Sequence, residues 1–248
     1  MARPTTSTRR RWSMPSMELS YYDGVWAYGC IIVAFLIVTL AQVILRVVSA
    51  KYKKVDSNQG LTGEQVARKI LQSNEINDVK IVKINGNLTD NFNNSNRTVS
   101  LSEDIYSGTS IASLSVAAHE CGHVIQYKVG YKPIKLRNKM VKIVNFGNTI
   151  GYIIMGIGLL ASVTELFIIG IILLSLAVVF QLVTLPCEFN ASKRANEELL
   201  RLGLIDESES RGVKSMLKAA AFTYVAGLFN SILQVLRLVF MYRNRRKK

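Results

Sequence analysis

The sequence predicts an α-helical integral membrane protein with a small α+β region that carries the motif His119-Glu-Cys-Gly-His123 on a helix. The first supporting observation is a set of long apolar runs, each able to cross a bilayer core of about 30 Å as a helix. The second is a more polar stretch, residues 51–142, between the first run and the second. The third is the motif itself, which holds the only two histidines of the chain.

The apolar runs divide the chain into membrane and non-membrane segments. Two of the runs lie close together and are joined at Thr164 and Glu165, which predicts a hairpin. The runs are too long for the apolar core of a signal peptide. We expect, in order, a disordered tail (1–20), a transmembrane helix (21–50), a soluble catalytic region (51–142), a transmembrane hairpin (143–186), a helical segment (187–218), a fourth membrane-embedded or interfacial helix (219–242) and a basic tail (243–248).

The net charge of +14 reflects Lys and Arg residues that are concentrated beside the apolar runs. A nucleic-acid-binding surface would interleave basic and aromatic residues on a soluble domain, so we exclude that class of partner. Basic flanks are typical of the cytoplasmic ends of membrane helices. They occur here at Lys51–Lys54, Lys132–Lys142 and Lys193–Arg201. We therefore expect a multi-pass protein of the cell membrane whose catalytic region faces the cytoplasm.

The fourth apolar run has a polar stripe, which leaves two arrangements open. The stripe consists of residues at alternating spacings of four and three, namely Thr223, Gly227, Asn230, Gln234 and Arg237. Such a helix can span the bilayer with the stripe packed against the other helices. It can also lie at the membrane interface with its basic tail in the cytoplasm. We favour the interfacial or partly inserted form, because it satisfies the charge rule.

The region between the first and second runs predicts a small sheet and two helices. Residues 61–72 form an amphipathic helix with Thr62 as its N-cap. Residues 79–84 and 97–102 alternate as strands, and residues 91–96 form a loop. In the second strand Val99 and Leu101 face the core, while the residues between and beside them, Thr98, Ser100 and Ser102, face out. The sequence leaves open which strand lies at the edge of the sheet.

The two histidines form a candidate metal site. Residues four apart lie on one face of a helix, so both imidazoles can bind the same ion. Glu120 can then reach a water bound to that ion and take its proton. The helix is opened by the cluster Ser107–Ser110 and closed by Gly130, and its apolar residues disfavour a solvated surface pair. The motif predicts one Zn²⁺ per chain, with Glu120 as the catalytic base.

A catalytic zinc ion needs a third protein ligand, and no histidine remains to supply it. A carboxylate or a cysteine must therefore serve. The hairpin returns the chain to the side of the motif at about Pro186, and Glu188 is the first acid met there. Pro186 predicts a helix start with Glu188 in the first turn, where a carboxylate also complements the helix dipole. Position alone leaves Glu197, Glu198 and the earlier acids as alternatives.

The three cysteines do not indicate a disulfide framework. Cys121 and Cys187 neighbour the candidate ligands, so a thiolate role has to be considered. On a helix, however, Cys121 is rotated by about 200° from His119. We expect these two residues and Cys30 to be small apolar fillers.

The order of His119-Glu-Cys-Gly-His123, two membrane spans and Glu188-Phe-Asn-Ala-Ser192 resembles the layout of membrane gluzincins such as HtpX and the CAAX prenyl proteases. From about Tyr21 onward the chain is similar to the YugP-type bacterial membrane zinc metallopeptidases. This similarity rests on residues 60–67, 86–90, 136–137, 144–147, 181–186 and 218–226. The resemblance implies a zincin-like catalytic region with Glu188 as the third zinc ligand. Ser192 stands where the HtpX pattern has an aspartate that orients the first histidine, and a serine accepts an imidazole N–H more weakly.

These observations lead us to expect a membrane-bound zinc-dependent endopeptidase that acts on peptides or membrane proteins near the bilayer. Zinc would lower the pKa of its water toward about 7, and Glu120 would take the proton. Arg194 and Tyr224 are candidate donors to the oxyanion. One rival is a non-enzymatic scaffold or transporter subunit with a structural zinc, which leaves Glu120 unexplained. A second rival, a zinc hydrolase with a non-peptide substrate, stays open.

Overall fold

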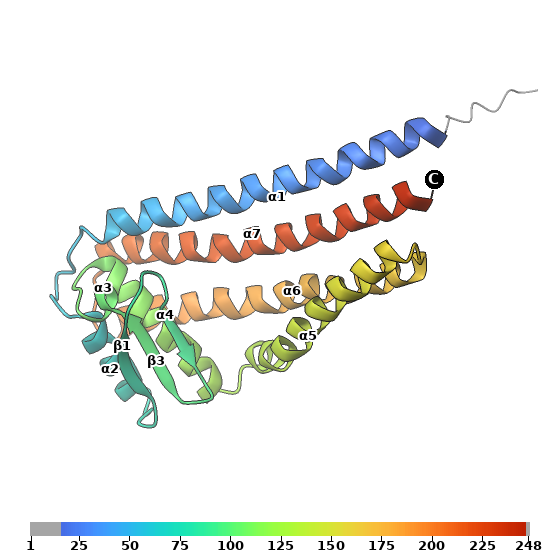
Figure 1. The fold of residues 1–248 in the computed structure, drawn as a ribbon. Coiled ribbons are helices and arrows are strands. Elements are labelled where there is room, and N and C mark those ends of the chain that lie inside the picture. Colours follow the sequence, from blue (N-terminus) through green and yellow to red (C-terminus); the bar gives the residue numbers. More distant parts are fainter. Residues whose placement is uncertain (1–15, 247–248) are drawn as a thin grey trace, which may run out of the picture.

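The computed structural model describes the backbone of residues 16–246 and the side chains of residues 22–245. Four long helices run roughly alongside one another, and a small α+β region sits at one end of them (Figure 1). We call this end of the bundle the sheet end and the opposite one the far end. The long helices are α1 (Ser16–Tyr52), α5 (Lys132–Leu160), α6 (Thr164–Arg201) and α7 (Glu207–Arg246). The α+β region contains α2 (Gly63–Ser73), β1 (Lys80–Ile84), β2 (Asn91–Asn93), β3 (Thr98–Ser102), α3 (Glu103–Tyr106) and α4 (Ile111–Lys128).

The four long helices are long and apolar enough to cross a membrane. The mean hydropathy of their most apolar windows lies between 1.5 for α7 and 2.9 for α6. Large apolar side chains on them are exposed, among them Phe35 and Phe146. This confirms the expected combination of a mostly helical chain, with four helices able to span a membrane, and a small sheet.

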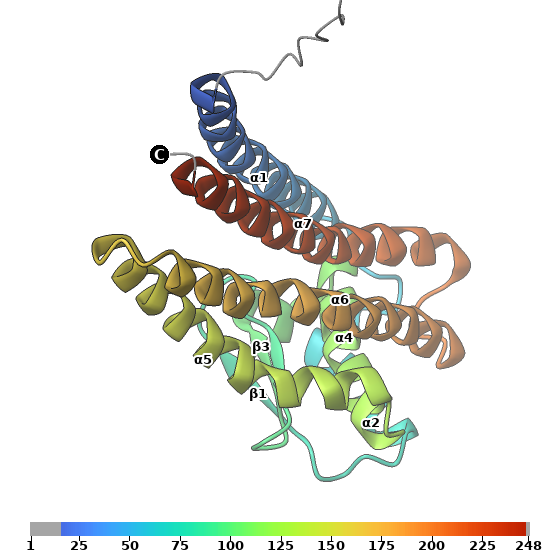
Figure 2. The same ribbon diagram turned by 90° about the vertical axis from the view of Figure 1, so that its right-hand side faces the viewer.

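The helices α1 and α7 lie side by side and run in opposite directions (Figures 1 and 2). Asp23, near the start of α1, lies 3.7 Å from Arg243, near the end of α7. The guanidinium of Arg245 lies over the ring of Phe167, at the start of α6. The α5–α6 turn, the start of α1 and the end of α7 therefore share the far end. The helix α7 is long and apolar enough to cross a membrane beside α1, and the choice between the spanning and the interfacial arrangement of the fourth run stays a prediction.

Several segment boundaries differ from the expectation. Residues 1–15 of the expected tail lie outside the described residues, whereas residues 16–20 already belong to α1. The hairpin turns at residues 161–163, so Thr164 and Glu165 lie in the first turn of α6. The expected helix start at Pro186 is wrong, because this proline lies inside α6, which continues to Arg201. A proline lacks the N–H for one helical hydrogen bond, but membrane helices tolerate that loss where neighbouring groups compensate.

The sheet has the order β1-β3-β2, with β1 parallel and β2 antiparallel to the central β3. The strand β2 lies within residues 91–96, so the expectation of a loop there is wrong over Asn91–Asn93. Val99 and Leu101 are fully buried, as expected, but Ser102 is buried too. The backbone N–H and the hydroxyl of Ser102 donate to the carboxylate of Asp90, which satisfies the polar groups that burial removes from water.

The helix α4 joins the α+β region to the bundle. Its buried side chains share one core with residues of β3, α6 and α7. Leu114 and Val124 of α4 are fully buried in this core, together with Leu199 of α6 and Val213 of α7. In Figure 2, α6 passes in front of α4 where the bundle meets the α+β region. Residues on α4 are therefore brought against the sheet ends of two membrane helices.

Candidate metal centre

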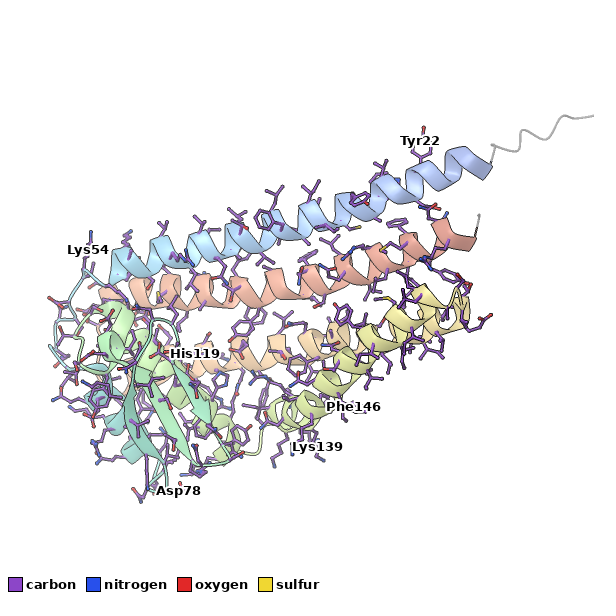
Figure 3. The ribbon with its side chains drawn as sticks, viewed as in Figure 1. Tyr22, Lys54, Asp78, His119, Lys139 and Phe146 are labelled. Carbon is purple, nitrogen blue, oxygen red and sulfur yellow. The ribbon has the colours of Figure 1, made fainter. Side chains whose placement is uncertain are left out.

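The helix α4 places the two histidines on one face. The hydroxyl of Ser110 caps the helix by accepting a hydrogen bond from the N–H of Ser113 at 3.2 Å. From that start the motif falls in the middle of α4, and the rings of His119 and His123 lie edge to face with centroids 4.8 Å apart. Figure 3 shows His119 between the α+β region and the bundle. Both imidazoles lie close to the carboxylate of Glu188 in α6.

The carboxylate of Glu188 in α6 meets both imidazoles. Its Oε2 lies 3.3 Å from Nε2 of His119 and 3.4 Å from Nε2 of His123. One ligand atom from each of the three residues lies within 4.8 Å of the others. Glu188 is 1% exposed in total, and its Oε1 is a buried acceptor without a hydrogen-bond partner among the described residues.

The three residues fit a zinc ion. Two imidazole nitrogens and one carboxylate oxygen are a donor set used by catalytic zinc, with a fourth position left open. An orphaned buried carboxylate oxygen is costly unless a cation or a donor satisfies it. The Arg137 guanidinium, 3.8 Å from that oxygen, offsets part of the charge but lies beyond hydrogen-bond distance. Among the alternative third ligands, Glu198 is bound to Arg201 and Asn74, away from the histidines.

Each histidine has a partner on its other ring nitrogen. The hydroxyl of Ser192 lies 3.3 Å from Nδ1 of His119, where the sequence pattern places it. The Oε1 of Gln126 lies 3.1 Å from Nδ1 of His123. Gln126 itself donates to the carbonyl of Cys187 at 2.7 Å, one residue before Glu188. Such partners fix the tautomer and the orientation of a ligand histidine.

Gln126 was not predicted as a site residue, although its spacing from His123 offered a signal. It follows His123 by three residues and so lies on the same face of α4. By bonding both His123 and the backbone beside Glu188, it ties the second ligand helix to the first.

Glu120 lies beside the candidate ligands and is not one of their cluster. It is buried, and burial raises the pKa of its carboxyl, although His119 and His123 act in the opposite direction. A carboxyl with a raised pKa is a stronger base than one in water, which suits proton abstraction near neutral pH. The neighbouring Cys121 is fully buried in the core, and burial raises the pKa of its thiol, so a thiolate ligand is disfavoured there.

Two hollows meet at Glu120. The first has a volume of about 440 Å³, is lined by His123, and is rich in polar groups such as Arg137. The second has a volume of about 270 Å³, is lined by His119, and has mostly apolar walls from α1, α4 and α7, such as Leu45. Both hollows include Glu120 and two further residues, Asp90 and Tyr224. The candidate ligands therefore lie between the polar hollow and the apolar hollow.

The two candidate oxyanion donors differ in position. Tyr224 of α7 lines both hollows with Glu120. Arg194 donates instead to Asn190, one turn earlier on α6, at 2.9 Å, and is not among the residues that line either hollow. Arg137, which the sequence analysis did not single out, lines the polar hollow and is the cation nearest to Glu188.

The strand β2 lies at an edge of the sheet and lines the polar hollow. Asn91, Phe92 and Asn93 pair with β3 on one side only. All three also line the hollow that contains Glu120 and His123. An edge strand presents unpaired backbone groups that an extended peptide can use.

The fold has four helices able to cross a membrane, and the site is a cluster of three residues that could hold a metal ion. Comparison with known proteins gives the family of the chain. The chain belongs to the family described as "Putative neutral zinc metallopeptidase", whose model matches residues 27–243. It is 43% identical over 196 residues to a protein of Bacillus subtilis (strain 168) named "Putative membrane protease YugP". That match covers 79% of this chain and 87% of the Bacillus protein. No solved structure matches the chain.

Proposed function

We propose that the protein is a membrane-bound, zinc-dependent endopeptidase. The observation that carries the proposal is the convergence of His119, His123 and Glu188 on one point, with Glu120 beside it and outside the ligand set. A binding protein has no need of that fourth residue, whereas a hydrolase needs a base at this position. Membership of a zinc metallopeptidase family supports the same function.

In this proposal His119, His123 and Glu188 hold one zinc ion, which acidifies a water molecule and polarises the scissile carbonyl when bound. The carboxylate of Glu120 takes the proton of the attacking water and later delivers it to the leaving amine. Ser192 and Gln126 hold the imidazoles in place through their Nδ1 atoms. Tyr224 is the better placed of the two candidate oxyanion donors, because it lines both hollows with Glu120.

The surroundings of the site support a peptide substrate at the membrane surface. An extended segment that pairs with β2 would pass Glu120 and enter both hollows. The apolar hollow is walled by Gln42 and Leu45 of α1, a helix that is apolar enough to span the bilayer. Membrane proteins or membrane-proximal peptides therefore fit the cleft best, with the site on the cytoplasmic side that the basic flanks favour.

The two rival functions account for fewer of these features. A structural zinc is usually enclosed by four protein ligands, whereas three candidate ligands here adjoin two hollows. A hydrolase of non-peptide substrates would use the same zinc chemistry. That rival function does not explain why the free edge of β2 lies beside Glu120.

Cleavage by the purified full-length protein tests the proposal. The unsubstituted chain, incubated with a proteome-derived peptide mixture, should produce new termini that disappear with a chelator and return with zinc. Glu120→Gln should still bind about one equivalent of zinc but should lose the cleavage, because Glu120 is a base and no ligand. Zinc loss in Glu120→Gln, or full cleavage by it, would show that Glu120 has another role. A zinc-loaded chain that cleaves no peptide would favour one of the rivals.

A further inference from the structure

A third hollow lies between α6 and α7 and contains neither Glu120 nor either histidine. We call it the α6–α7 groove. Its volume is about 570 Å³. The residues that matter for the argument are Phe189 and Lys193 on α6, and Lys214, Lys218, Phe222 and Val225 on α7.

Charged and apolar side chains are separated along this groove in the same direction on both helices. On α6, which runs toward the sheet end, Phe189 precedes Lys193 by one turn. On α7, which runs toward the far end, Lys214 and Lys218 precede Phe222 and Val225. The lysines therefore gather toward the sheet end and the apolar side chains toward the middle of the bundle.

Two of the lysines are free to bind an anion. The third lysine, Lys193, is paired, because its Nζ lies 3.7 Å from a carboxylate oxygen of Glu197, one turn later on α6. Lys214 and Lys218 are exposed, and within residues 22–245 neither makes an ion pair. The apolar wall is open as well, since Phe189 is 50% exposed and Phe222 is 36% exposed. A cationic rim next to an uncovered apolar wall matches a molecule with a negative head and an apolar tail.

We propose that the α6–α7 groove binds an anionic phospholipid. The phosphate lies against Lys214 and Lys218, and an acyl chain runs along Phe189, Phe222 and Val225. Val225 follows Lys218 by seven residues, so a helical rise of 1.5 Å per residue places it about 10 Å deeper. Basic pockets between membrane helices on the cytoplasmic side are suited to anionic headgroups. The groove also includes Ser192, so the lipid borders the helical turn that supports His119.

The proposal can be tested by fluorescence, without measuring hydrolysis. The chain has two tryptophans, Trp12 and Trp26, which are replaced by phenylalanine. Phe222→Trp then puts a single reporter in the groove. The full-length protein is placed in bilayers that contain increasing amounts of brominated phosphatidylglycerol or brominated phosphatidylcholine, since bromine quenches tryptophan on contact. Quenching by the anionic lipid should reach its half-maximum at a clearly lower mole fraction than quenching by the zwitterionic lipid.

Two double variants show whether the preference belongs to the groove. Lys214→Gln/Lys218→Gln should reduce the preference for phosphatidylglycerol at least about fivefold, as expected for the loss of a lysine that faces a headgroup. Lys132→Gln/Lys135→Gln removes the same charge from the start of α5, outside the groove, and should leave the preference unchanged.

Three results would overturn the proposal. Equal quenching by the two lipids indicates an ordinary lipid-facing wall, and an equal effect of the two double variants indicates a diffuse surface charge. If neither lipid quenches the tryptophan but its fluorescence changes with protein concentration, a second copy of the chain covers the groove. Native mass spectrometry of the unsubstituted chain avoids the reporter. It should detect one retained phosphatidylglycerol, which Lys214→Gln/Lys218→Gln loses and Lys132→Gln/Lys135→Gln keeps.

Discussion

The backbone of Gly122 in α4 lies directly against the backbone of Ala191 in α6. A Cβ atom on Gly122 would lie 2.5 Å from the carbonyl oxygen of Ala191, closer than such atoms come in proteins. Gly122 directly precedes His123, and Ala191 follows Glu188 by one helical turn. The close approach of the two helices therefore sets the distance between the imidazoles and the carboxylate.

Gly122→Ala should push α4 away from α6 and separate the candidate ligands. We expect a loss of stability of about 1–3 kcal/mol, as for other overpacked cores, together with weaker zinc binding. Gly156→Ala in α5 is the control, because its Cβ meets no atom within 4 Å. Thermal unfolding and zinc content of the two purified variants give the comparison. A Gly122→Ala protein as stable and as zinc-rich as the control would mean that the helix contact is not tight.

Glu188→Ala should leave the purified protein with far less zinc, because it removes the one carboxylate that meets both imidazoles. Glu197→Ala and Glu198→Ala should keep about one equivalent, since neither carboxylate belongs to the ligand cluster. Metal analysis after dialysis against a weak chelator measures the difference. Normal zinc content in Glu188→Ala would place the third ligand elsewhere.

Ser192→Ala should weaken zinc binding by roughly 10-fold to 100-fold, because His119 loses the partner of its Nδ1 atom. Ser192→Asp should be tolerated and should bind zinc at least as tightly, since a carboxylate is a stronger acceptor for an imidazole N–H. Competition with a zinc indicator measures both affinities. The opposite order of the two variants would argue against Ser192 as a support of His119.

Cysteine labelling in intact cells tests the orientation in the membrane. Glu165→Cys and Arg246→Cys lie at the far end, and Asn87→Cys lies in the α+β region. If the α+β region faces the cytoplasm, an impermeant thiol reagent should label the first two positions and spare the third until the cells are opened. The unsubstituted chain is the control, because its three cysteines are buried. Labelling at Glu165→Cys without labelling at Arg246→Cys would contradict the antiparallel packing of α1 and α7.

The sequence was sufficient to predict the parts of the site that depend on local spacing. His119 and His123 are four residues apart, and a helix that contains both must place them on one face. The hairpin predicted that Glu188 lies on the same side of the membrane as His119 and His123, because two spans return the chain to the side from which it started. The N-cap at Thr62 was also predicted, and the cap of α4, Ser110, lies within the predicted cluster Ser107–Ser110.

The remaining features depend on contacts between distant segments. The polar stripe and the basic tail do not predict that α7 packs along α1, because this contact joins the two ends of the described chain. Pro186 indicates a helix start in water, whereas a membrane helix can continue through it. The three residues of β2 are too few and too rich in Asn to show strand alternation. Arg137 reaches the site from α5, so no spacing within the chain links it to Glu120.

The pairing of the first long helix with the last one has a consequence for synthesis on the ribosome. The segments that carry His119, His123 and Glu188 are translated before α7, whereas Tyr224 and Met216, which wall the apolar hollow, arrive only with the final helix. A nascent or C-terminally truncated chain therefore has its candidate ligands but not its enclosed cleft. Packing of α7 beside α1 therefore completes that cleft only after the other described helices and strands have been translated.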